Sequence, residues 1–193
     1  MDNSDVFLTG DKVRLRAFRE EDQDAAYSYL SQPELDGRRY LPWKLPNSGP
    51  LTQASIKVCL EDWSERDKKM VAAITPAGED RVIGHVGGSW KWDPLLSSVW
   101  LVVDPREQRK GFGSEALQLM LGYIYENLPA NNISLWVSDW NEAGLAFGRS
   151  QGFKECGVMR RAGLRDGAFY GEVVMDLLRR EWIKMEKEAH DGA

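Results

Sequence analysis

A strand, a glycine-containing loop and a long helix follow one another in the second half of the chain, and this order constrains the fold most. Residues 98–103 form a short apolar, β-branched run that predicts a buried strand, which Asp104 and Pro105 end. Gly111 and Gly113 then open a helix, in which apolar residues recur at Leu117, Leu121, Ile124 and Leu128. This helix is expected to pack one face against a sheet.

The rest of the chain alternates between short strands and helices. Further strands are predicted at residues 12–18, 70–74, 82–92 and 132–138, and a hairpin at 153–164 and 168–178. Further helices are predicted at residues 20–30, 52–67, 141–151 and 181–188. No repeat, low-complexity tract or linker interrupts this order, so one domain is expected over residues 1–193.

Composition excludes several classes of protein. A formal net charge of −5 disfavours a nucleic-acid partner, because such proteins present a basic surface. The sequence has no apolar run of about 18 residues and no secretory signal, so we expect no membrane partner and a cytoplasmic location. Cys59 and Cys156 form neither a disulfide framework nor a metal-ligand spacing, so no metal is expected.

The glycine loop has the features of an anion site. The first amides of a helix have no intrahelical acceptor, and the helix dipole favours negative charge at that end. Gly111 and Gly113 allow a phosphate to approach the backbone, and Arg109 and Lys110 add positive charge. Neither a Walker A loop nor a complete Rossmann fingerprint is present. The residues therefore favour phosphate binding without identifying the ligand that carries the phosphate. A simple tight turn stays an equal alternative.

Two segments together resemble a known family. Residues 102–117, VVDPREQRKGFGSEAL, resemble the coenzyme A segment of the GNAT superfamily of N-acyltransferases, whose pattern is Gln/Arg-x-x-Gly-x-Gly/Ala. Residues 141–153, NEAGLAFGRSQGF, are similar to the second segment of that family. Residues 13–22 and 172–182 look like the branch that contains the ribosomal-protein N-terminal acetyltransferases.

The resemblance implies a fold and a cofactor site. The implied fold is α/β (α+β), with a mixed, mostly antiparallel twisted sheet of about 6–7 strands flanked by helices, in which two splayed strands form the coenzyme A cleft. The pyrophosphate would lie on the loop, and the pantetheine arm would pair with the preceding strand and contact the start of the second segment. The implied cofactor-binding residues are Leu101, Val102, Val103, Gln108, Arg109, Lys110, Gly111, Phe112, Gly113, Ser114 and Asn141.

The implied activity is acetyl transfer from acetyl-CoA to a primary amine, on a peptide N-terminus or a small molecule, by direct attack on the thioester. Two alternatives stay open: a non-catalytic sensor that binds acyl-CoA, and a transferase for a bulkier acyl group. A homodimer is left open as the assembly.

The proton-handling residues of the family are absent from their usual positions. The family's tyrosine falls at Gly148, the serine of the ribosomal-protein branch at Gly144, and a frequent carboxylate at Ser97 or Ser98. Ser98, as a relay through water, and His85, as a base near neutral pH, are the substitutes we consider. A packing role is the alternative for each.

Overall fold

The computed structural model describes residues 5–35, 51–64 and 68–191. Its internal contacts divide the chain into two compact units, residues 1–89 with 100–122, and residues 90–99 with 123–193. The boundaries fall inside two strands and one helix, which therefore contribute to both units. The single domain expected over residues 1–193 stays a prediction.

The first unit contains an antiparallel meander. Its strands pair in chain order, and they are β1 (Val6–Thr9), β2 (Val13–Arg16), β3 (Lys69–Pro76) and the first part of β4 (Gly84–Asp93). Val13 and Leu15 on β2 are completely buried, as the period-two alternation predicts.

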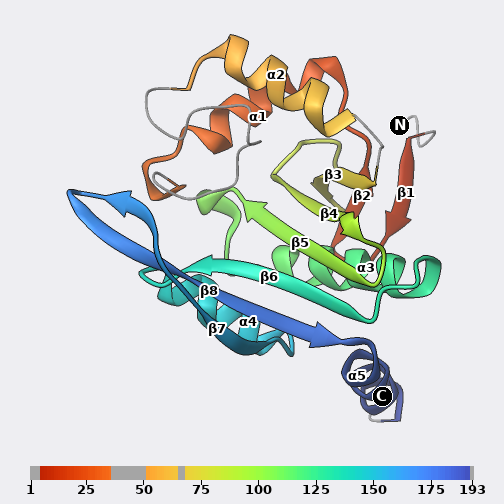
Figure 1. Cartoon of the computed structure of the whole chain (residues 1–193). Coiled ribbons are helices and arrows are strands. Elements are labelled where there is room, and N and C mark those ends of the chain that lie inside the picture. The colour runs from red at the N-terminus through yellow and green to blue at the C-terminus, as the bar shows by residue number, and fades with distance from the viewer. Residues whose placement is uncertain (1–4, 36–50, 65–67, 192–193) are drawn as a thin grey trace. The chain divides into compact units, whose positions relative to one another are not determined.

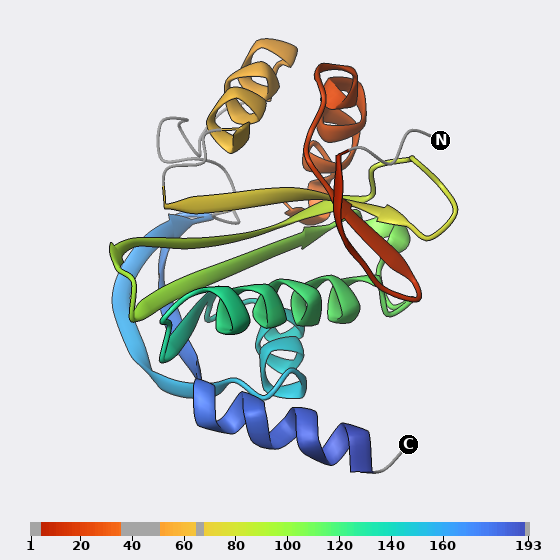
Figure 2. The ribbon, with the colours of Figure 1, turned by 90° about the vertical axis from the view of Figure 1, so that its right-hand side faces the viewer.

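Helices cover both faces of this part of the sheet (Figures 1 and 2). On one face lie α1 (Gln23–Leu30), preceded by the 3-10 turn η1 (Glu20–Asp22) and followed by η2 (Pro33–Leu35), together with α2 (Gln53–Ser64). The first turns of α3 (Phe112–Asn127) lie on the other face. Tyr29, Ile56 and Trp63 belong to the apolar cluster that joins α1 and α2 to the strands.

The second unit contains the predicted hairpin. Its strands β7 (Lys154–Arg165) and β8 (Ala168–Leu178) are joined through Asp166 and Gly167, whose φ angles of 51° and 77° suit a tight hairpin turn. Strand β8 also pairs antiparallel with β6 (Asn132–Ser138). The first half of β5 (Leu96–Val103) pairs with β6 in parallel, from Leu96 opposite Asn132 to Val99 opposite Leu135.

Two helices complete the second unit. Helix α4 (Glu142–Ser150) contacts β6, and α5 (Arg179–Asp191) follows β8 directly. Close packing of α4 depends on Gly148, because a Cβ there would lie 2.8 Å from the sulfur of Met175 on β8. The guanidinium of Arg179 donates to the carbonyls at the end of α3, including that of Leu128 at 2.6 Å.

The sheet confirms the fold class and adds one strand to the expected number. It has eight strands in the order β1-β2-β3-β4-β5-β6-β8-β7, whereas about 6–7 were expected. The strand that was not predicted is β1, because its four residues are too few to show a clear alternation. Within the described residues, no helix is long and apolar enough to cross a membrane.

Candidate functional site

The loop between β5 and α3 begins with a capped turn. Asp104 caps the 3-10 turn η3 (Pro105–Glu107) by accepting hydrogen bonds from the Arg106 amide at 2.9 Å and from its guanidinium at 2.6 Å. Burial acts to raise the pKa of the Asp104 carboxyl, but the hydrogen bonds from Arg106 outweigh burial and hold this pKa below its ordinary value. The positive charge of Arg106 is therefore neutralised within the loop by Asp104.

The backbone of the predicted phosphate loop leads directly into the N-terminus of α3. Arg109 and Gly111 have φ angles of 62° and 87°, in the left-handed region that favours glycine. The Glu115 amide donates to the Gly111 carbonyl at 3.2 Å, so helical hydrogen bonding begins directly after the two glycines. The amides at the start of α3 precede this bond, and the helix dipole adds partial positive charge there.

The cations of this loop differ in how far they are neutralised. The Lys110 ammonium pairs with the Glu107 carboxylate at 2.7 Å, and Arg81 approaches the same carboxylate at 2.9 Å. These hydrogen bonds, the one from Lys110 above all, lower the pKa of Glu107. Within residues 5–35, 51–64 and 68–191, Arg109 has no ion pair, so its charge stays available to an anion.

A second segment, which sequence reasoning did not associate with the loop, reaches it from the β1–β2 turn. The Nζ atom of Lys12 lies 2.8 Å from the position that a Cβ atom would take on Gly111. The Glu115 carboxylate, in the first turns of α3, accepts the Lys12 amide at 2.7 Å. Nothing in the local pattern around Lys12 signals this contact, because the two segments are 103 residues apart.

The residues predicted to pair with the pantetheine arm end β5. Val102 and Val103 are buried and Leu101 is half-buried. The Gln108 side-chain amide donates to the Val103 carbonyl at 3.0 Å, which ties the loop back to the strand. Gly84 on β4 lies so close that a Cβ there would be 2.2 Å from the Val102 carbonyl oxygen. Pairing of these residues with a pantetheine arm stays a prediction.

Asn141 stands at the start of α4, in the second unit. Its side-chain oxygen accepts the Gly144 amide at 3.2 Å, so Asn141 is the N-cap of the helix. A Cβ atom on Gly144 would lie 2.4 Å from the Asn141 side-chain nitrogen, which explains why the third residue after the cap is a glycine. Contact between Asn141 and the cofactor stays a prediction.

The two substitutes for the missing proton handlers lie in different surroundings. His85 on β4 is fully buried, and burial lowers its pKa to about 3. Its Nδ1 atom lies 2.9 Å from the Tyr29 hydroxyl, and within the described part of the chain its Nε2 atom has no partner. Ser98 on β5 is half-buried and pairs in register with Ser134 on β6. Their catalytic roles stay predictions, and the burial of His85 favours packing.

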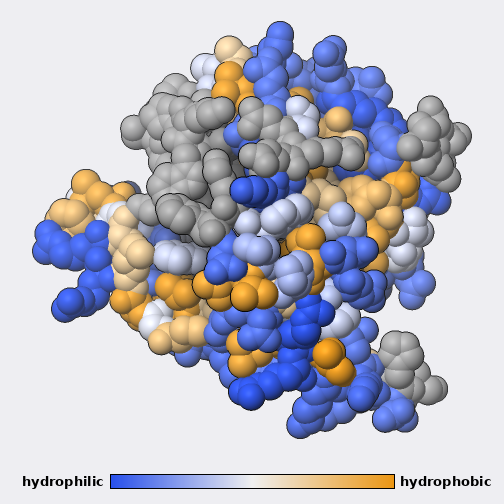
Figure 3. All heavy atoms as spheres, turned by 45° about the vertical axis from the view of Figure 1, so that its right-hand side comes forward, coloured by the Kyte–Doolittle hydropathy of each residue, from blue (hydrophilic) through white to orange (hydrophobic). Residues whose placement is uncertain are grey.

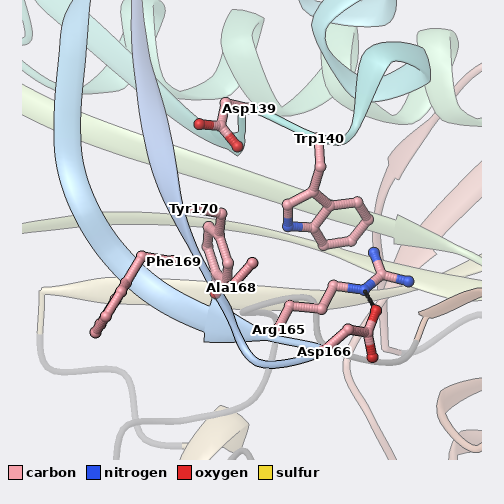
Figure 4. A pocket seen from close by; sticks show the side chains of 7 residues that line it. All are labelled: Asp139, Trp140, Arg165, Asp166, Ala168, Phe169 and Tyr170. Carbon is pink, nitrogen blue, oxygen red and sulfur yellow. Dashed lines mark ion pairs between the residues drawn. The ribbon is translucent and has the colours of Figure 1, made fainter.

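A cleft of about 410 Å³ lies in the second unit, at the β7–β8 hairpin (Figure 4). Its lining combines aromatic and charged side chains, from Asp139, Trp140, Arg165, Asp166, Ala168, Phe169 and Tyr170. The Arg165 guanidinium lies 3.9 Å from the centre of the Trp140 ring, a cation–π contact. Figure 3 shows hydrophobic and hydrophilic groups side by side on this hairpin.

Short contacts give the cleft its shape. The Asp139 carboxylate accepts the Gly171 amide at 2.7 Å, which fixes the end of β6 to β8. The Tyr170 ring meets the Trp140 ring edge-on, at 6.2 Å between centroids. Gly163 makes room for Tyr170, because a Cβ on Gly163 would lie 2.3 Å from the Tyr170 hydroxyl oxygen. These contacts hold Asp139, Trp140 and Tyr170 in place, while Asp166 and Phe169 at the hairpin end are exposed.

Comparison with known proteins agrees with this fold and loop. Residues 12–154 match the family model described as "Acetyltransferase (GNAT) domain". The chain is 22% identical over 177 residues to "Uncharacterized N-acetyltransferase YnaD" of Bacillus subtilis (strain 168), covering 92% of this chain and 99% of that protein. It is 25% identical over 180 residues to "Uncharacterized N-acetyltransferase p20" of Bacillus licheniformis, covering 91% and 97%.

A solved structure shows the same fold. The acetyltransferase (GNAT family) from Bacillus anthracis superposes with a TM-score of 0.76 at 18% identity, covering 90% of this chain and 99% of that one. An open α/β sheet flanked by helices, with a glycine loop before α3, is thus the fold of an acetyltransferase. The family match extends over most of the chain, so this protein belongs to the GNAT acetyltransferase family and is an N-acetyltransferase.

Proposed function

We propose that this chain transfers the acetyl group of acetyl-CoA to a primary amine, and that the loop from Gln108 to Ser114 holds the pyrophosphate of the cofactor. The conformation of Gly111 carries this proposal. With a φ of 87° directly before α3, Gly111 leaves the helix N-terminus open where a side chain would intrude. Arg109 supplies a positive charge that no carboxylate of the described residues neutralises.

The chemistry requires little of the side chains. Bound acetyl-CoA would supply the activated acyl group. A neutral amine would attack the thioester carbon, so that the C–N bond forms and the C–S bond breaks; coenzyme A would leave as a thiolate and take up a proton from water, and the nitrogen would lose one to water. An α-amino group, with a pKa of about 8, is far easier to deprotonate at neutral pH than a lysine side chain at about 10.4. We expect a backbone amide of residues 101–103 to stabilise the oxyanion, which needs no particular residue type. Direct attack therefore suits a chain without the family's usual tyrosine.

We propose a peptide N-terminus as the acceptor, and we propose that the cleft at Trp140 in the second unit binds side chains of that peptide. Arg165, two carboxylates and the aromatic rings of Trp140 and Tyr170 give this cleft both polar and stacking contacts, which suit a short peptide. The likeness of residues 13–22 and 172–182 to the ribosomal-protein branch supports the same acceptor class.

Calorimetric titration with coenzyme A tests the loop. Gly111→Glu is expected to abolish binding while the protein still folds, because a side chain and a negative charge would enter the phosphate position. Gly78→Glu is the matched control, since Gly78 also has a positive φ, of 84°, and has nothing within 4 Å of a built Cβ. Unchanged affinity in Gly111→Glu would remove the loop from the site.

A thiol-release assay with acetyl-CoA and a panel of peptides and small amines tests the activity. Trp140→Ala is expected to raise KM for the acceptor and to leave coenzyme A affinity unchanged. Trp136→Ala is its control, because Trp136 lies on the same unit and is 46% exposed. Tight binding of acetyl-CoA without transfer to any acceptor would favour a sensor instead. Faster turnover with a larger acyl donor would show that this larger group, and not acetyl, is the one transferred.

A further inference from the structure

The turn between β1 and β2 is wrapped around the carboxylate of Glu115. Three consecutive backbone amides donate to it, those of Asp11 at 3.0 Å, Lys12 at 2.7 Å and Val13 at 2.7 Å. The turn approaches so closely that a Cβ on Gly10 would lie 2.6 Å from the carboxyl carbon of Glu115. Three charge-assisted hydrogen bonds to one carboxylate hold this turn against the start of α3.

This anchoring determines where the Lys12 side chain extends. Its amide is fixed to Glu115, and its ammonium lies beside Gly111, 2.8 Å from the Cβ position of that glycine. The ammonium therefore stands at the helix N-terminus, next to the loop proposed to hold the pyrophosphate. The Glu115 carboxylate is already satisfied by backbone amides, which leaves the ammonium for another anion.

The charges around the loop support the same conclusion. Arg106 and Lys110 are paired with Asp104 and Glu107. For Lys12, as for Arg109, the structure records no ion pair within residues 5–35, 51–64 and 68–191. These two cations come from segments far apart in the chain, and both are free to neutralise a phosphate.

We propose that Lys12 binds a phosphate group of coenzyme A, and that Glu115 is the positioning residue that holds Lys12 there. This inference rests on the proposed function of the loop. It adds a side chain from the first strands of the chain to a site otherwise made from the loop before α3. The phosphate is either that of the pyrophosphate or the 3′-phosphate, and both present the same charged oxygens to an ammonium.

Titration of purified variants with coenzyme A, dephospho-coenzyme A and pantetheine tests the role of Lys12. Lys12→Met keeps an unbranched side chain of similar length and removes its charge. We expect it to weaken coenzyme A binding about fivefold to tenfold, the range for an exposed charge-assisted contact, and to leave pantetheine binding unchanged. Lys12→Arg should restore most of the affinity, and Lys57→Met, at an exposed position on α2, should change nothing.

The three ligands separate the possible outcomes. If Lys12→Met also lowers the affinity for dephospho-coenzyme A, Lys12 contacts the pyrophosphate. If it lowers the affinity for coenzyme A alone, Lys12 contacts the 3′-phosphate. Unchanged coenzyme A affinity in Lys12→Met, or equal weakening of pantetheine, would overturn the inference. If Gly111→Glu abolishes coenzyme A binding while Lys12→Met leaves it unchanged, only the assignment of Lys12 is wrong. If neither variant changes binding, the assignment of the loop as the pyrophosphate site is wrong as well.

A double-mutant cycle tests the role of Glu115. Glu115→Ala should weaken coenzyme A binding as much as Lys12→Met, and the double variant should be no weaker than either single one, because both changes remove the same contact. Glu115→Gln keeps the shape and an acceptor oxygen, so it provides a folded comparison. Additive losses of coenzyme A affinity in the cycle would show that Glu115 has only a structural role. So would an equal loss of pantetheine affinity in Glu115→Ala.

Discussion

The Nδ1 atom of His85 lies 2.9 Å from the hydroxyl oxygen of Tyr29, in the buried core of the first unit. The Trp63 ring covers the same imidazole, with 4.4 Å between ring centroids. Because burial lowers the pKa of His85 to about 3, the ring stays neutral throughout the physiological range. A histidine that looks like a base in the sequence is thus held as a neutral hydrogen-bonding partner inside an aromatic cluster.

His85 should make folding stability depend on pH. Its folded pKa, about 3, is below the ordinary value of 6.5, so its contribution is complete above pH 6.5 and is lost as the pH falls toward 3. Between pH 7 and pH 5 the free energy of unfolding should fall by about 2 kcal/mol from this group alone. Urea unfolding of the wild type and His85→Gln at both pH values measures it; equal losses in the two proteins would contradict the assignment.

Gly148 should not accept the tyrosine that the family resemblance implies at this position. A Cβ there would already lie 2.8 Å from the Met175 sulfur and 3.2 Å from a methyl carbon of Leu135. Gly148→Tyr should therefore lower the free energy of unfolding by about 3 kcal/mol and leave kcat no higher. In Gly148→Ala the gain in helix propensity should offset the contact. Chemical unfolding and the thiol-release assay check both variants, and a stable, faster tyrosine variant would disprove the packing argument.

Capping and cofactor contact can be separated at Asn141. Asn141→Ala removes the acceptor for the Gly144 amide and should cost about 1 kcal/mol of stability. Asn141→Ser keeps a good cap but shortens the side chain, so it should be nearly as stable as the wild type. If Asn141 contacts the pantetheine arm, Asn141→Ser should still bind pantetheine more weakly in calorimetry. Wild-type affinity in this variant would limit Asn141 to capping.

The ion pair between Arg16 and Asp22 should contribute strongly to folding. Both residues are buried, at 1% and 5% exposure, and the guanidinium donates to both carboxylate oxygens, at 2.7 and 2.8 Å. Asp22→Ala leaves a buried charge without this partner and should cost about 3–5 kcal/mol. Asp80→Ala, which removes a half-exposed partner of the same arginine, should cost less than about 1 kcal/mol. Thermal and urea unfolding compare the two; similar losses would refute the distinction.

Local patterns predicted most of the second unit well. Residues 132–138 were predicted as a strand and are β6, and the hairpin closes at Asp166 and Gly167 as expected. Such features depend on turn chemistry and on alternation within a few residues, so the sequence contains them directly. Glycine, proline and aromatic residues predict a loop at residues 36–50, which lie outside the described residues.

Other expectations depended on contacts that no local pattern encodes. Alternation along residues 12–18 puts Arg16 on the polar face of the predicted strand, opposite Val13 and Leu15, yet Arg16 is buried because Asp22 is there to pair with it. His85 looked like a candidate base, and its burial between α1, α2 and β4 became visible only in the fold. In both cases a residue from another segment bonds to the buried polar group: Asp22 pairs with Arg16, and the Tyr29 hydroxyl meets Nδ1 of His85.

The sequence by itself determined the family, the glycine loop before α3 and the absence of the usual tyrosine at Gly148, because these are matters of residue type and spacing. The tertiary structure alone decided that Lys12 reaches Gly111 and that Trp140 and Arg165 line one cleft. Those relationships join segments that are distant along the chain. Their geometry arises from packing, such as the hold of Glu115 on the β1–β2 turn, and not from any periodicity in the sequence.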